Sequence, residues 1–88
     1  MGLPKRFIAG EVILEDQPDE CAEGVSVTLV SETGTQNVKT DHYGDFEFEG
    51  LEPSRDFVVK IEHEGYRPKE FSVKTHTDIN LGEILLKF

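Results

Sequence analysis

The sequence TDHYGDFEFEGL, residues 40–51, is the clearest fold signal of this chain, because a turn pattern leads directly into an alternating strand pattern. Asp41 and Gly44 stand at the first and fourth positions of a type I turn, where each residue type is favoured. After the turn, Phe46 and Phe48 fall on one face of a strand and the acidic residues between them on the other. The stretch therefore predicts a tight turn followed by a half-buried β-strand.

Six other segments show short strand-like runs, and none shows a sustained helical period with caps. Gly10 lies inside the first of them and predicts a bulge or a close backbone approach. Gly82 divides the last, so we expect a bulge there and a switch of the inward-facing side chains after Ile79 and Leu81. The seven predicted strands cover residues 7–14, 24–31, 36–40, 44–49, 57–63, 69–75 and 79–87. Strands this short, separated by turns, predict an all-β chain that forms a seven-stranded antiparallel β-sandwich.

The length of 88 residues predicts one domain spanning residues 1–88 and not two. No apolar run approaches the roughly 20 residues that a membrane span needs. Residues 1–4 lead into a strand and not into the apolar core of a signal peptide, so no export signal is visible. We therefore expect a soluble domain, favour a cytoplasmic location, and expect that the domain is excised from a longer protein.

The net charge of −9, from 18 acidic and 9 basic residues, limits the partners of the domain. Phosphate backbones and anionic membrane surfaces repel such a surface, so we expect neither nucleic-acid binding nor membrane binding. The same charge steers the domain towards a basic partner. The charge pattern thus favours a protein partner with a positively charged face.

The candidate catalytic groups are weak. Cys21 has acidic neighbours, which disfavour the thiolate that a reactive cysteine needs. Glu47 and Glu49 lie on one outward face, about 7 Å apart by strand rise, which is a spacing found in inverting glycosidases. No aromatic platform flanks this pair, because Phe46 and Phe48 point inward. We therefore expect two solvated carboxylates, no catalytic residue, and a chain that is not an enzyme.

The candidate metal ligands are three histidines and one acidic loop. His42, His63 and His76 have no partner at a ligand spacing. The acidic loop, residues 15–23, does not follow the EF-hand pattern and is interrupted by Pro18. We expect no metal and no bound cofactor, although the sequence leaves open whether the loop binds a cation.

Two tyrosines differ in their expected roles. Tyr66 follows a turn glycine and is expected to fold over the end of the sandwich as part of the core. Tyr43 lies at the turn tip beside His42 and is expected to be exposed. The tip formed by His42 and Tyr43 is the one candidate contact for a partner.

These segments together resemble a known family. The shared motifs are GEV at 10–12, GVSVTL at 24–29, TD at 40–41, GDF at 44–46, GL at 50–51, GY at 65–66 and DINLG at 78–82. In type and spacing they resemble the carboxypeptidase regulatory-like domain, from residue 7 to residue 86. The resemblance implies an Ig-like or prealbumin-like β-sandwich.

A closer resemblance is to the C-terminal sandwich domain of the small iron–sulfur subunit of transhydroxylase-type molybdenum oxidoreductases. A [4Fe–4S] cluster needs four ligands, and this chain has one cysteine, so the cluster would belong to the parent protein. The resemblance implies a non-catalytic accessory domain that contacts other domains or subunits of that parent. Separately, we expect the domain to be a monomer in isolation. The alternative is a carbohydrate- or cell-surface-binding module of an exported enzyme or adhesin, against which the absence of tryptophan counts.

Overall fold

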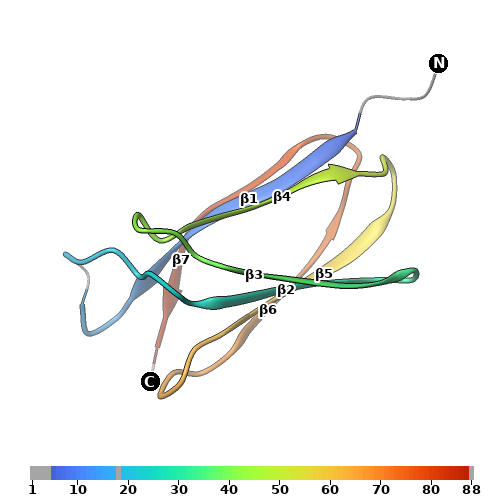
Figure 1. Ribbon diagram of the computed structural model, residues 1–88. Coiled ribbons are helices and arrows are strands. Elements are labelled where there is room, and N and C mark those ends of the chain that lie inside the picture. The colour runs from blue at the N-terminus through green and yellow to red at the C-terminus, as the bar shows by residue number, and fades with distance from the viewer. Residues whose placement is uncertain (1–4, 18, 88) are drawn as a thin grey trace.

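The computed structural model describes residues 5–17 and 19–87 as two packed β-sheets (Figure 1). Residues 1–4, the predicted breaker Pro18 and residue 88 lie outside the described residues. The strands are β1 (Arg6–Leu14), β2 (Ser26–Ser31), β3 (Gly34–Lys39), β4 (Asp45–Leu51), β5 (Asp56–Glu62), β6 (Lys69–Lys74) and β7 (Ile79–Leu86). All seven predicted strands are confirmed, with ends displaced by two residues at most. No described segment forms a helix long and apolar enough to cross a membrane.

The two sheets differ in strand direction. Sheet A has the order β4-β1-β7, and sheet B has the order β3-β2-β5-β6. All neighbours in sheet B are antiparallel, whereas β1 runs antiparallel to β4 and parallel to β7. The prediction of an antiparallel sandwich is therefore wrong for one pair in sheet A. Parallel neighbours need a long connection, and here all the other strands lie between β1 and β7 in the chain.

The core lies between the inner faces of the two sheets. The alternation predicted for β4 is confirmed, because Phe46 and Phe48 are buried and their rings meet edge to face at 6.2 Å. The other buried apolar residues are Ile8, Val12, Leu14, Ala22, Val25, Val27, Leu29, Leu51, Phe57, Val59, Ile61, Ile84 and Leu86. Burial of these side chains supplies the main stabilising free energy of the fold.

Gly10 allows a core side chain to lie against the backbone of β1. Its pairing partner on β4 is Phe46, and a Cβ atom at Gly10 would lie 2.8 Å from the Phe46 ring. Real Cβ atoms do not approach a ring so closely, so any side chain here must displace the ring. The predicted close approach is confirmed.

The predicted bulge in β7 is also confirmed. Between two paired positions of β1, β7 contains one extra residue at Gly82, whose φ is 70°. The Asn80 Oδ1 atom accepts a hydrogen bond from the Gly82 N–H at 2.9 Å. Leu81 is half-buried before the bulge and Ile84 is buried after it, so the inward face changes from odd to even positions.

Two buried threonines fix the ends of the edge strands of sheet B. The Thr40 Oγ1 atom, just after β3, accepts a hydrogen bond from the Val25 N–H at 2.9 Å. The Thr75 Oγ1 atom, just after β6, accepts one from the Arg55 N–H at 3.0 Å and donates one to the Glu52 carbonyl at 2.7 Å. Each hydroxyl therefore satisfies loop backbone groups that burial would otherwise leave unpaired.

Candidate functional site

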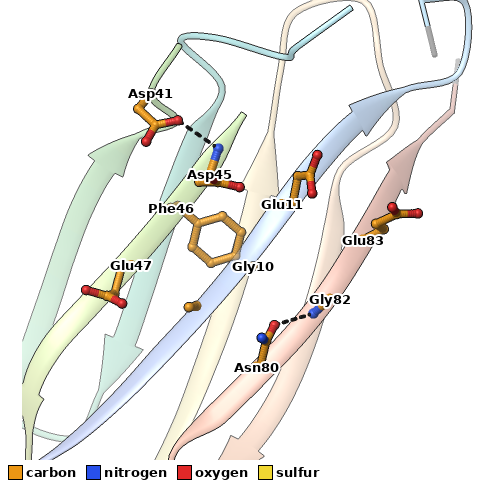
Figure 2. Close-up of a pocket in the computed structure, with 10 residues that line it drawn as sticks. Gly10, Glu11, Asp41, Asp45, Phe46, Glu47, Asn80, Gly82 and Glu83 are labelled. Carbon is orange, nitrogen blue, oxygen red and sulfur yellow. Dashed lines mark hydrogen bonds between the residues drawn. The ribbon is translucent and has the colours of Figure 1, made fainter. Parts of the chain in front are cut away.

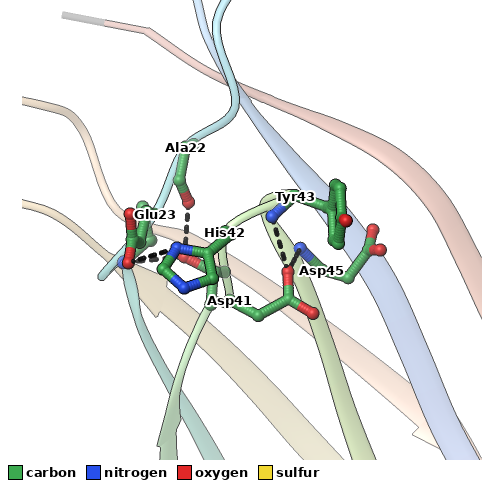
Figure 3. A network of polar contacts seen from close by, with 8 residues as sticks. Ala22, Glu23, Asp41, His42, Tyr43 and Asp45 are labelled. Carbon is green, nitrogen blue, oxygen red and sulfur yellow. Dashed lines mark hydrogen bonds and ion pairs between the residues drawn. The ribbon is translucent and has the colours of Figure 1, made fainter.

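The turn after β3 is held by its own aspartate. The Asp41 Oδ1 atom accepts hydrogen bonds from the N–H groups of Tyr43 at 2.9 Å and Asp45 at 3.0 Å (Figure 3). The Gly44 N–H donates to the Asp41 carbonyl at 3.0 Å, which confirms the predicted turn. The Val12 N–H donates to the Gly44 carbonyl at 2.8 Å. The turn is thus fixed both internally and against β1.

The predicted tip is exposed at this turn. The His42 side chain is 84% exposed, and its Nδ1 atom lies 2.9 Å from Oε1 of Glu23. Tyr43 is 69% exposed and projects from the turn (Figure 3). The exposure of both residues is confirmed, and their role as a partner contact stays a prediction.

The outer face of sheet A is acidic. The sequence alone did not predict that carboxylates from three strands lie together there. The acidic face, as we name it, consists of the carboxylates of Glu11 on β1, Asp45, Glu47 and Glu49 on β4, and Glu83 on β7. Glu11 is directly opposite Asp45 on one side and directly opposite Glu83 on the other. Like charges placed directly opposite each other across strands destabilise a sheet. This row, Asp45–Glu11–Glu83, is therefore an unfavourable feature of the isolated domain.

A hollow of about 510 Å³ lies over this row (Figure 2). Its floor is low because Ala9 is small and Gly82 has no side chain, and nothing lies within 4 Å of where a Gly82 Cβ atom would be. The described lining residues are Ala9, Gly10, Glu11, Asp41, Asp45, Phe46, Glu47, Asn80, Gly82 and Glu83. Five carboxylates and no basic side chain thus surround a small-residue floor.

Glu47 and Glu49 are exposed, as predicted, but they interact. A hydrogen bond between their side chains, followed by partial desolvation and the charge of Glu49, raises the pKa of Glu47. Sequence alternation placed both on one face and treated each as an independent solvated group. A raised pKa means that Glu47 releases its proton less readily than an ordinary glutamate.

The outer face of sheet B has a different chemistry. Four of its charged residues lie directly opposite a residue of the other sign, Asp56 opposite Lys74 and Lys60 opposite Glu70. The Asn37 Nδ2 atom donates hydrogen bonds of 2.9 Å to two hydroxyls on β2. The other outward residues of β2 and β5 include small hydroxyl and valine side chains. We call this the neutral face.

The other residues that were considered from the sequence do not line the hollow over the acidic face. Tyr66 packs partly buried against the core, as predicted, and its ring stacks on His63 at 5.5 Å. Its hydroxyl donates to Asp16, and this hydrogen bond, with some desolvation, raises the pKa of Tyr66 to about 12. Cys21 is exposed. Within residues 5–17 and 19–87, no three His, Cys, Asp or Glu side chains are grouped to hold a metal ion.

Sequence reasoning missed Glu11 and Glu83. Alternation could assign each to an outward face, but only the order β4-β1-β7 brings them beside Asp45. Strand order and parallel pairing are not encoded in local alternation. The acidic side chains at these two outward positions were the available signal.

Comparisons with known proteins agree on the fold. The sequence profile of the carboxypeptidase regulatory-like domain matches residues 8–83. No curated protein sequence matches the chain. Neither of the two similar solved structures described next is an iron–sulfur subunit, so the closer resemblance drawn from the sequence gains no support from them.

Two solved structures show the likeness. The 5-hydroxyisourate hydrolase of Klebsiella pneumoniae is 17% identical with a TM-score of 0.71, over 91% of this chain and 90% of that one. The 3-chlorocatechol 1,2-dioxygenase of Rhodococcus opacus 1CP is 10% identical with a TM-score of 0.62, over 99% of this chain and 60% of that one. The chain thus spans about three fifths of the dioxygenase. At these identities the likeness shows the fold alone.

The hydrolase corrects one expectation. From the acidic neighbours of Cys21 and the solvated pair Glu47 and Glu49, we expected a chain that is not an enzyme. That expectation is wrong, because a solved hydrolase has this same sandwich fold. Catalytic groups come together in space from separate strands and loops, so the absence of a local motif does not exclude them.

Proposed function

Because the chain belongs to the carboxypeptidase regulatory-like domain family, we propose that it is an interaction domain that holds a positively charged partner surface on its acidic face. The observation that carries this proposal is the row Asp45–Glu11–Glu83, in which like charges face each other across three strands. Such a row lowers the stability of the free domain. A partner that places lysine or arginine beside the row relieves this repulsion, and the relief contributes to the free energy of binding.

The shape of the acidic face suits long basic side chains. The hollow of about 510 Å³ lies in the range of roughly 300–1,000 Å³ that ligand sites occupy. Lysine and arginine pack their alkyl stems on apolar surface while their charged ends reach polar groups. Ala9 supplies an apolar part of the lining. The carboxylates of Glu11, Asp45, Glu47 and Glu83 stand around the hollow (Figure 2).

The proposed partner is a neighbouring domain or subunit of the parent protein. The sequence resemblance to the sandwich domain of small iron–sulfur subunits is what supports that parent. A Cys-x-x-Cys-x-x-Cys run upstream in the same reading frame would strengthen this assignment. A signal peptide and a hydrolase domain there would instead favour the cell-surface or carbohydrate-binding alternative.

The proposal is tested by binding of an octalysine peptide. The variant carrying Glu11→Gln, Asp45→Asn and Glu83→Gln is compared with one carrying Glu15→Gln, Asp19→Asn and Glu20→Gln in the acidic loop. Both variants lose the same charge, but only the first removes the row. We expect the first to bind at least about tenfold more weakly than the second, since each paired charge contributes specifically at short range. Equal losses would mean that net charge alone attracts the peptide and would reject the proposal.

Hydrolysis is a second candidate function, favoured by one observation. Glu47 lies beside Glu49 on an open face, and the side-chain hydrogen bond between them raises the pKa of Glu47. The fold is shared with a 5-hydroxyisourate hydrolase. Decay of 5-hydroxyisourate in the presence of the chain, followed by absorbance, tests this function. Activity that Glu47→Gln abolishes would support it, and decay at the buffer rate would reject it.

A further inference from the structure

Each sheet ends in two strands with a free backbone edge, and three of these four edges are protected. A free strand edge can pair with a strand of another chain. Charged side chains, bulges and register shifts discourage such pairing. β4 carries three carboxylates and a register shift against β1, and β7 contains the bulge at Gly82. β6 carries Lys69, Glu70 and Lys74 among its six residues.

The fourth edge, β3, has the fewest of these features. Its six residues, GTQNVK, pair with β2 in one unbroken register from Gly34 to Lys39. Lys39, at the end of the strand, is its one charged residue. No proline and no bulge interrupts it. In a chain with 31% charged residues, a regular edge strand whose single charge lies at its last residue stands out.

The backbone of β3 presents alternate residues to solvent. The Thr40 N–H donates to Val25, and the Thr40 carbonyl accepts from Gly24, so even-numbered residues point their backbone groups towards β2. In an antiparallel ladder, the residues between them point the other way. The N–H and C=O groups of Thr35, Asn37 and Lys39 therefore face outward. Sheet B ends at β3, and no backbone hydrogen bond between β3 and β4 occurs in the described part of the chain.

The edge is also held in place before any partner arrives. The Asn37 side chain donates hydrogen bonds to the hydroxyls of Ser26 and Thr28 on the neutral face. On the opposite side, Val38 packs half-buried against the core. A strand fixed on both sides loses little conformational entropy when it pairs, which favours binding.

We propose that the outer edge of β3 accepts an extended segment of a partner protein as a fifth strand of sheet B. Main-chain hydrogen bonds to Thr35, Asn37 and Lys39 would supply affinity, as in other cases of strand addition. Side chains of the added strand that face inward lie beside Val38, so apolar residues suit alternate positions. The net charge of −9 disfavours a second copy and favours a segment that carries lysine or arginine. This surface is distinct from the acidic face.

A peptide with the sequence of β2 is the probe, because its apolar residues alternate and can lie beside Val38 when the peptide pairs with the outer edge. The peptide KSVTLVSK contains residues 26–31 between two lysines, and the control KSVTPVSK has the same charge but cannot form a regular strand. Binding is followed by amide chemical shifts and hydrogen exchange of the full chain. We expect KSVTLVSK to shift the amides of Thr35, Asn37 and Lys39 and to slow their exchange about tenfold, through new hydrogen bonds.

The matched variants are Asn37→Pro and Asn37→Ala. Both lose the side-chain hydrogen bonds to β2, but only proline removes the outward N–H, at an edge position where proline is tolerated. We expect Asn37→Ala to keep peptide binding and Asn37→Pro to lose it. Shifts that both peptides cause equally would report charge alone and overturn the proposal. It would also be overturned if β3 did not respond to millimolar KSVTLVSK, or if β3 became protected with rising protein concentration alone, which indicates a second copy.

Discussion

The two sheets have similar apolar inner faces, but their outer faces differ in how charged side chains are arranged across neighbouring strands. On the acidic face of sheet A, Glu11 stands between two other carboxylates. On the neutral face of sheet B, Lys60 stands opposite Glu70. Cross-strand pairs of opposite charge stabilise a sheet and pairs of like charge destabilise it. The neutral face is therefore arranged as expected for stability, and the acidic face is not.

The contrast between the two faces indicates where a binding surface lies in this sandwich. Local rules are broken in natural proteins chiefly where function requires it. The core and the neutral face follow those rules, as do the buried hydroxyls at Thr40 and Thr75. The acidic face departs from them in a row of three residues. We take that departure as the mark of the binding face.

The largest expected effect on the free energy of unfolding comes from overpacking the core beneath the acidic face. A Gly10→Val substitution places its Cβ atom 2.8 Å from the Phe46 ring, under the hollow. Overpacking of this kind should lower the free energy of unfolding by about 3 kcal/mol, measured by urea denaturation. Ala9→Val, on the outward side of the same strand, is the control and should change it by less than about 0.5 kcal/mol. Equal effects would show that the ring and Gly10 are not tightly packed.

The next effect tests how sheet B is held. Thr75→Val removes the hydroxyl that bonds Arg55 and Glu52 and leaves their buried backbone groups unpaired. The expected loss in the free energy of unfolding is about 2 kcal/mol. Thr77→Val, at an exposed position two residues later, should have almost no effect. If both variants melt at the same temperature, the Thr75 hydroxyl does not anchor the loop.

The fold could be predicted from sequence in its local parts. The local sequence predicted the alternation at Phe46 and Phe48 and the bulge at Gly82, because both features depend on residues that are close in the chain. The parallel pairing of β1 with β7 depends on contacts between residues about seventy positions apart, such as Ile8 and Ile79. No local pattern contains that information. The row through Glu11 follows from this pairing and was missed for the same reason.

A third, smaller effect is a change in the free energy of unfolding that should have opposite signs on the two faces. Glu11→Gln removes repulsion on the acidic face and should raise the free energy of unfolding by about 0.5–1 kcal/mol. Lys60→Gln removes an attraction on the neutral face and should lower it by about 0.5 kcal/mol. Both differences should shrink in molar salt, because salt screens exposed charges. Changes of the same sign would remove the contrast between the faces.

The smallest effect is a pH dependence. Glu49 raises the pKa of Glu47, so the folded state keeps this proton to higher pH than the unfolded state. The associated stability is present below the ordinary value of 4.5 and is lost as the pH rises through the raised pKa. In melting curves between about pH 3 and pH 7, Glu47→Gln should therefore gain stability over the native chain as the pH rises.

Glu52 provides the control of opposite sign. Its hydrogen bond and ion pair with Lys5 lower the pKa of Glu52, so its contribution is present above 4.5 and is lost as the pH falls through the lowered pKa. Glu52→Gln should lose stability against the native chain near neutral pH and match it in acid. The same trend for both variants would contradict the assigned causes.

The most direct test of the central claim is amide chemical-shift mapping of the native chain with octalysine. We expect the amides of Glu11, Asp45 and Glu83 to shift most, while those of Val58 and Ser72 on the neutral face do not move. The predicted shifts should vanish in high salt, since the attraction is electrostatic. Shifts on the neutral face, or shifts spread evenly over all acidic segments including residues 15–23, would contradict the claim that the acidic face is the binding face.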